Sequence, residues 1–142
     1  MCVKGNPLIL DFHVHHSQIT DPSKYAHWFD DLPHDIQSLV KTIQGLVVSL
    51  SWEDAYGLDM PQERQREIYL RTVPEMLKRI LELDSSALRV KRPPEKRKVG
   101  LCRDFAFLLV SMLRHQGVPA RVRVGFAGYY RAETPRYWDH RI

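Results

Sequence analysis

Long apolar runs are missing from this 142-residue sequence, and none approaches the roughly 18 residues that a membrane-spanning helix needs. The apolar run at 7–10 is also too short for the core of a signal peptide. Cysteine is scarce: Cys2 and Cys102 lie far apart, which indicates two thiols in a reducing compartment rather than a disulfide framework. Internal repeats and low-complexity tracts are absent as well. These absences predict a cytoplasmic protein without membrane contact, folded as one domain over 1–142.

Acidic residues are rare in the stretch 89–98, which holds six basic residues and one acid, Glu95. Such a run can attract an anionic partner, or it can form a solvated, extended loop around its two prolines. It contains no aromatic side chain on which a base could stack. We therefore expect a solvated loop and no nucleic-acid partner.

Apolar residues recur at helical spacing through the first two thirds of the chain. They predict helices over roughly 34–48 and 61–83. Inside the second range, Thr72 and Glu75 have the spacing of a capping box, and Pro74 cannot continue the hydrogen-bond ladder. We therefore expect a kink or a restart of the helix at that point.

The most informative pattern begins at position 100. Apolar residues surround a predicted helix over 102–116, so this helix should be central and buried, and Gly117 should end it. Strict alternation then predicts a strand over 120–127, and a second strand begins near Tyr137. The side chains expected to face inward from the first strand are Val122, Val124 and Phe126.

Cys102 is the candidate nucleophile, because it stands where this helix begins. A thiol attacks as its thiolate, which the N–H groups and the positive dipole of a helix N-terminus stabilise. Lys98 and Arg103 add positive charge nearby, and Gly100 allows a sharp turn that brings a substrate close to the backbone. The backbone N–H of Cys102 could act as an oxyanion donor. A cysteine on an apolar helix can also be buried packing, and this alternative stays open.

The order of these parts resembles the transglutaminase-like superfamily. The resemblance is specific over 99–128 and extends to His140, at the start of the second strand. It implies a papain-like α+β fold, in which a cysteine at a helix N-terminus packs on an antiparallel sheet that carries a histidine. By this resemblance Cys102 is the nucleophile and His140 its base. The residues that carry it are Gly100, Cys102, Asp104, Ala106, Leu113, Arg114, Gly117, Val118, Pro119, Ala120, Arg121, Gly125 and His140.

The superfamily places a third catalytic residue, an aspartate, on the strand after the histidine. The sequence ends two residues after His140, and Asp139 would point to the opposite face of its strand. We therefore expect a domain that lacks its C-terminal strands, with a helix-rich N-terminal part and an incomplete antiparallel sheet. Asp104 is expected to serve the first turn of its helix rather than catalysis. The open sheet edge predicts a homo-oligomer, or a frayed C-terminus.

A rival motif lies near the N-terminus, where Asp11, His13 and His15 follow an apolar run. If 8–15 is a strand, the two histidines project to one side and could bind a metal, as in metal-dependent amidohydrolases. Such barrels need roughly 200 residues or more, and the sequence holds no second histidine cluster. An exposed, histidine-rich segment is the simpler interpretation.

Two functions remain open from the sequence. The first is cysteine-dependent acyl transfer or amide hydrolysis on a protein, a peptide or a small amide, without a cofactor or metal. The second is an interaction module that keeps the fold without catalysis. A metal-dependent hydrolase that uses the N-terminal histidines is the third and weakest alternative.

Overall fold

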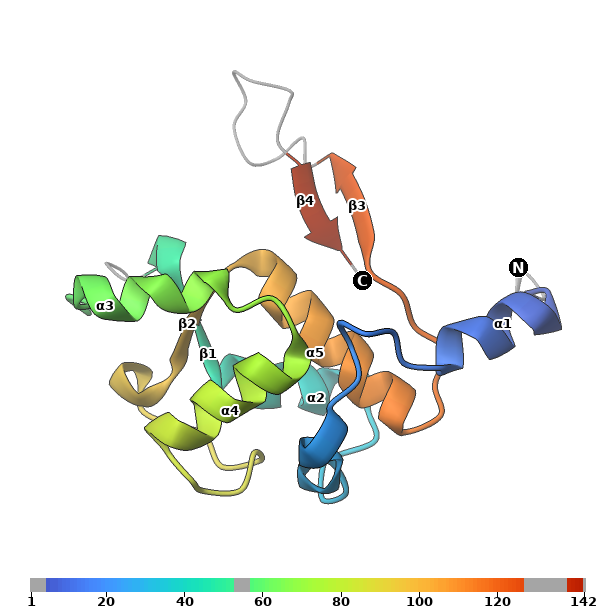
Figure 1. The fold of residues 1–142 in the computed structure, drawn as a ribbon, viewed down its shortest axis with the longest axis horizontal. Coiled ribbons are helices and arrows are strands. Elements are labelled where there is room, and N and C mark those ends of the chain that lie inside the picture. Colours follow the sequence, from blue (N-terminus) through green and yellow to red (C-terminus); the bar gives the residue numbers. More distant parts are fainter. Residues whose placement is uncertain (1–4, 53–56, 127–137, 142) are drawn as a thin grey trace.

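A computed structural model of the chain describes residues 5–52, 57–126 and 138–141 (Figure 1). The 3-10 helices among its elements are labelled η. In chain order the elements are α1 (Pro7–Val14), η1 (Ser23–Phe29), α2 (Ile36–Gln44), β1 (Val47–Ser49), η2 (Leu50–Trp52), α3 (Gln62–Gln65), η4 (Arg66–Tyr69), α4 (Val73–Leu83), η5 (Pro94–Lys96), β2 (Lys98–Gly100), α5 (Cys102–His115), β3 (Arg123–Phe126) and β4 (Trp138–Arg141).

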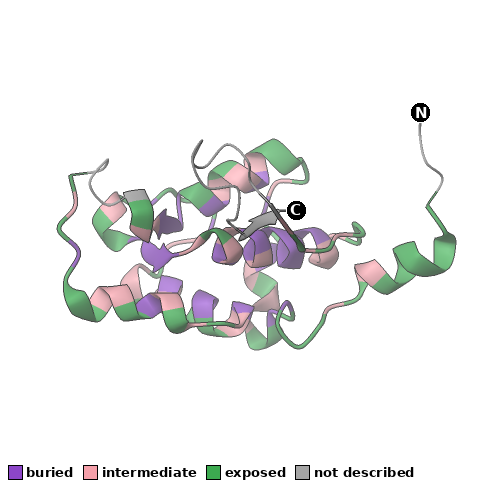
Figure 2. Ribbon diagram, turned by 90° about the horizontal axis from the view of Figure 1, so that it is seen from above, coloured by how far each residue is buried: buried purple, intermediate pink, exposed green. Residues whose placement is uncertain are grey.

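The core lies where α5 packs against α2 and α4, and the buried residues gather there in Figure 2. The apolar positions that the helical spacing selects are the ones that turn inward. The fully or almost fully buried side chains of these helices include Leu39, Ile43, Met76, Leu77, Ile80, Leu108 and Met112. The prediction of a central, buried helix that begins at Cys102 is therefore confirmed.

The described strands form two separate pairs. β1 and β2 are parallel, with Val48 opposite Val99, whereas β3 and β4 are antiparallel, with Val124 opposite His140. The prediction of one antiparallel sheet under the cysteine helix is therefore not met. The strand that leads into α5 is β2, and its partner is parallel. What the structure supports is a helix-rich α+β fold that is consistent with the papain-like class.

Two helix predictions needed correction. The helix expected over 34–48 ends at Gln44, because Val47 and Val48 leave it to pair with β2. The helix expected over 61–83 is broken into α3, η4 and α4. The restart falls where the sequence placed it: the Thr72 hydroxyl accepts the N–H of Glu75, and the Glu75 carboxylate accepts the N–H of Thr72.

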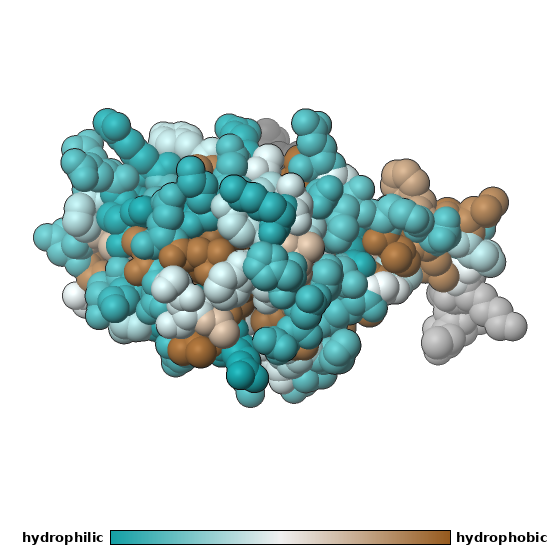
Figure 3. All heavy atoms as spheres, turned by 60° about the horizontal axis from the view of Figure 1, so that its bottom comes forward, coloured by the Kyte–Doolittle hydropathy of each residue, from teal (hydrophilic) through white to brown (hydrophobic). Residues whose placement is uncertain are grey.

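The N-terminal segment is a helix, so the strand considered over 8–15 is wrong. Asn6 caps α1, because its Oδ1 accepts the N–H of Leu8 at 3.0 Å, and Pro7 starts the first turn. α1 projects from the body of the molecule, and its apolar side chains, Leu8 and Phe12 among them, are exposed (Figure 3).

The C-terminal strand prediction and the basic-loop prediction were each only partly right. β3 begins at Arg123, and Val124, expected to face inward, is 55% exposed. In the basic stretch, Arg92, Arg97 and Lys98 are buried rather than solvated. The Arg92 guanidinium is buried because it donates to backbone carbonyl groups between 84 and 90, including that of Ser86 at 2.5 Å.

Within the described ranges, no helix is both long and apolar enough to cross a membrane.

Candidate active site

Cys102 is the first residue of α5 and is exposed. β2 ends two residues earlier at Gly100, so a parallel strand delivers the chain directly to the start of the helix. The first N–H groups of a helix have no acceptor within it, and they carry its positive dipole end. The alternative of a buried packing cysteine is therefore excluded, and the thiol lies where a helix favours a negative charge.

Gly100 makes the turn before Cys102 possible by having no side chain. A Cβ built on Gly100 would lie 2.7 Å from Cγ1 of Val47 and 2.9 Å from Oδ2 of Asp104. Both distances are below any normal contact for a Cβ. Glycine is needed here because the side chains of Val47 in β1 and Asp104 in α5 fill the space that a Cβ would occupy.

Asp104 holds this turn together from inside the protein. Its Oδ2 accepts the N–H of Leu101 at 3.1 Å and lies 3.1 Å from Nζ of Lys98, while its Oδ1 lies 3.3 Å from Nε of Arg103. Lys98 also donates to the carbonyl oxygen of Val99 at 2.9 Å. Neither Asp104 nor Lys98 is exposed. The expectation that Asp104 serves the first turn of the helix is thus confirmed, with a buried ion pair that the sequence did not predict.

Burial lowers the pKa of Lys98, and the neighbouring Asp104 partly opposes this shift. A lone ammonium in this position would be driven toward its neutral form, because the interior solvates a charge poorly. The carboxylate of Asp104 is therefore what allows Lys98 to be buried as a cation.

A second buried carboxylate, Glu67 of η4, supports β2 from its other edge. Its Oε2 accepts the N–H of Val99 at 2.7 Å, and its Oε1 lies 2.5 Å from Nε of Arg64 and 2.8 Å from Nε of Arg79. Arg103 adds a link to η4 by donating to the carbonyl oxygen of Ile68. Sequence reasoning missed Glu67, although its spacing of three residues from Arg64 is a recognised pattern for an ion pair on a helix.

The structure places the backbone of His140 in β4, opposite Val124, and β4 lies beside α5 (Figure 1). The side chain of His140 lies outside the described part of the structure, so its pairing with Cys102 stays a prediction.

The histidines of the rival metal motif are not arranged as expected. His13 is in α1, whereas His15 follows the last residue of that helix with an extended backbone, so the two do not project from one strand. His15 uses its Nδ1 on the carbonyl oxygen of Asp11 at 2.8 Å. Among the described residues, no group of three or more His, Cys, Asp or Glu side chains is placed to hold a metal ion.

A family model described as the transglutaminase-like superfamily matches residues 59–140, the segment that runs from the start of α3 through α5 to β4. The match includes both Cys102 and His140. No curated protein and no solved structure gave a match.

Proposed function

Because this chain belongs to the transglutaminase-like superfamily, we propose that it performs cysteine-dependent acyl transfer or amide hydrolysis, with Cys102 as nucleophile and His140 as base. One observation carries the proposal: Cys102 is exposed at the first position of α5, on a turn that Gly100 and the buried Asp104 hold in place. The substrate would be an amide of a protein, a peptide or a small molecule.

The reaction would proceed through a thioester. His140 takes the proton of the Cys102 thiol, and the sulfur attacks the amide carbonyl carbon. The N–H groups at the start of α5 donate hydrogen bonds to the carbonyl oxygen, on which negative charge develops. Collapse of this intermediate breaks the C–N bond, and protonated His140 gives its proton to the leaving amine. Water or a second amine then attacks the thioester carbonyl and gives a proton to His140. The C–S bond breaks, the proton passes from His140 to the sulfur, and the products are those of hydrolysis or transamidation with the thiol restored.

Alkylation by iodoacetamide tests the nucleophile. In a Cys2→Ser background, which leaves Cys102 as the only cysteine, the rate is measured from pH 5 to pH 9 by mass spectrometry of the Cys102 peptide. We expect alkylation below pH 7 to be faster than for an ordinary thiol, which titrates near about 8.5. We expect His140→Gln to move the rate profile toward higher pH, because it removes the cationic partner of the thiolate.

The same measurement separates the proposal from the non-catalytic alternative. A rate profile that follows an ordinary thiol, unchanged by His140→Gln, would leave an interaction module as the function. A matched variant on the same strand, Asp139→Asn, controls for general effects of changing β4, because neighbouring residues of a strand point to opposite faces.

A further inference from the structure

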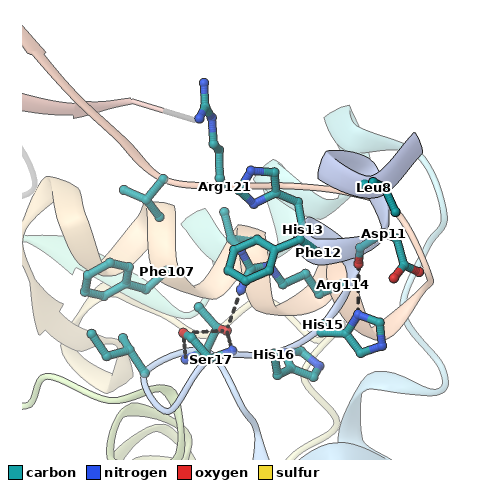
Figure 4. A pocket seen from close by; sticks show the side chains of 14 residues that line it. Leu8, Asp11, Phe12, His13, His15, His16, Ser17, Phe107, Arg114 and Arg121 are labelled. Carbon is teal, nitrogen blue, oxygen red and sulfur yellow. Dashed lines mark hydrogen bonds between the residues drawn. The ribbon is translucent and has the colours of Figure 1, made fainter. Parts of the chain in front are cut away.

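A cavity of about 550 Å³ lies between α1, the loop that follows it and the outer face of α5 (Figure 4). Its apolar walls include Phe12 of α1, Phe107 and Val110 of α5, and Val122, which precedes β3. Small-molecule sites commonly enclose roughly 300–1,000 Å³ and are mostly apolar with a few polar groups. The size and the mostly apolar lining of this cavity fit that class, and the cavity is open to solvent on the side of α1, where Leu8 and Phe12 are exposed.

The walls of the cavity are tied to one another by Arg114. Its Nε donates to the carbonyl oxygen of Ala120 at 2.9 Å, and its Nη1 donates to Oγ1 of Thr20 at 3.2 Å. The N–H of Ala120 in turn donates to the carbonyl oxygen of His13 at 3.2 Å. α5, the loop after α1 and the segment before β3 are thereby fixed against each other, so the cavity exists before any ligand enters.

Arg114 also supplies positive charge to the cavity. Its Nη2 makes no hydrogen bond to any residue in the described ranges. Two other charged residues line the cavity. Asp11 is exposed, and the side chain of Arg121 points away from Arg114, so Arg114 is the cation nearest to an anion bound at its guanidinium (Figure 4). An anion that enters the cavity therefore finds a guanidinium with donor capacity left.

Two histidines provide the remaining polar atoms. Nδ1 of His13 and Nδ1 of His16 are buried, and neither has a hydrogen-bond partner among the described residues. Both residues line the cavity, and the rest of each imidazole ring can offer a polar atom to a ligand. Burial lowers the pKa of His16, so its neutral ring can donate one hydrogen bond and accept another.

We propose that this cavity binds a small organic carboxylate with an apolar body, its carboxylate on Arg114 and its polar contacts completed by His13 and His16. A planar carboxylate suits the guanidinium fork, and the aromatic and aliphatic walls suit the body of the ligand. The site is separate from Cys102, because Arg114 lies about 18 Å farther along the helix axis at 1.5 Å per residue. The proposal therefore does not depend on catalysis at Cys102.

Ligand-observed and histidine-observed NMR on the full chain test this site, with 3-phenylpropionate as probe and neutral 3-phenylpropanamide as its matched control. We expect saturable shifts of the His13 and His16 ring protons with the carboxylate. The amide should bind at least about ten-fold more weakly, because it lacks the charge-assisted contact. Phenyl phosphate, run in parallel, tells whether a phosphate can replace the carboxylate. Binding of phenyl phosphate alone would overturn the assignment of a carboxylate.

Two variants locate the binding. Val122→Trp fills the cavity and should weaken 3-phenylpropionate about ten-fold or more. Val124→Trp, which adds the same side chain at an exposed position outside the lining, should leave the affinity unchanged. Thermal unfolding of both variants checks that they are folded. Equal binding of the acid and the amide, no saturable shift, or equal effects of the two tryptophans would each overturn the proposal.

Discussion

Replacing Asp104 by asparagine tests whether the buried ion pair under the Cys102 turn is essential to the fold. The substitution keeps the shape and the carbonyl oxygen that accepts the Leu101 N–H, but it removes the negative charge 3.1 Å from Nζ of Lys98. Both side chains are fully buried, and breaking such a pair from one side costs about 3–5 kcal/mol of unfolding free energy. At about 2–4 °C per kcal/mol, the melting temperature should fall by roughly 6–20 °C.

The loss should also depend on pH, and its sign follows from Lys98. Its pKa in the folded protein is already below 10.5 because of burial, and Asp104 is the nearest group that raises it. Without Asp104 the folded pKa falls further. Between that lowered pKa and 10.5 the unfolded chain binds more protons than the folded one, so stability rises with pH across this window. The rise should be steeper in Asp104→Asn than in the parent protein.

Urea unfolding at several pH values between 6 and 10 measures both effects. Asp35→Asn is the matched control, because Asp35 caps the exposed start of α2 through the N–H of Ser38, and asparagine caps equally well. The double variant Lys98→Met, Asp104→Asn should recover much of the lost stability and lose the added pH dependence. A cost below about 1 kcal/mol for Asp104→Asn, with no change in pH dependence, would refute the reasoning, because water would then be solvating Lys98.

Three further outcomes are expected. Gly100→Ala should lower the unfolding free energy in urea by about 1–3 kcal/mol, because its Cβ would lie 2.7 Å from Cγ1 of Val47. Gly125→Ala should not, because a Cβ there meets no atom of the described residues within 4 Å; equal effects of the two variants would contradict this. Glu67→Gln should cost about 3–5 kcal/mol in the same assay and raise hydrogen exchange at the β2 amides, since it removes the charge that two arginines share; unchanged exchange would contradict it. Hydrogen bonds from backbone N–H groups and the Thr72 hydroxyl lower the pKa of Glu75 in the folded protein. Its contribution to stability is therefore complete above about pH 4.5 and is lost as the pH falls through the pKa of the folded protein. In an acid titration of stability, Glu75→Gln should lack this loss.

The elements that the sequence predicted correctly are those whose signals are local. The helix that begins at Cys102 has an apolar pattern along its whole length, and the restart at Thr72 has a complete capping box. Such patterns stabilise the same structure whatever surrounds them. The location of Cys102 at the start of a helix followed from them, whereas its exposure came from the structure.

The predictions that failed depend on contacts between distant parts of the chain. Val47 and Val48 fit the end of an apolar helix as well as they fit a strand, and only their pairing with β2 decides between the two. In the same way, the short apolar run of α1 is ambiguous between strand and helix until its cap is known. Buried Arg92 and Lys98 escaped prediction because a charged side chain is normally exposed, and their carbonyl and carboxylate partners cannot be read from local spacing.

The buried charges next to Cys102 act on its position more than on its charge. From the sequence, Lys98 and Arg103 were expected to stabilise a thiolate directly. In the structure both cations lie within ion-pair distance of the same Asp104 carboxylate. Its negative charge offsets much of the positive potential that Lys98 and Arg103 would create at the Cys102 sulfur. The same carboxylate accepts the Leu101 N–H, and Glu67 accepts the Val99 N–H, so the backbone on either side of Gly100 is fixed. The N–H groups of the first turn of α5 can therefore stabilise a negative sulfur in addition to the proposed His140, and the two carboxylates hold the backbone that leads to them.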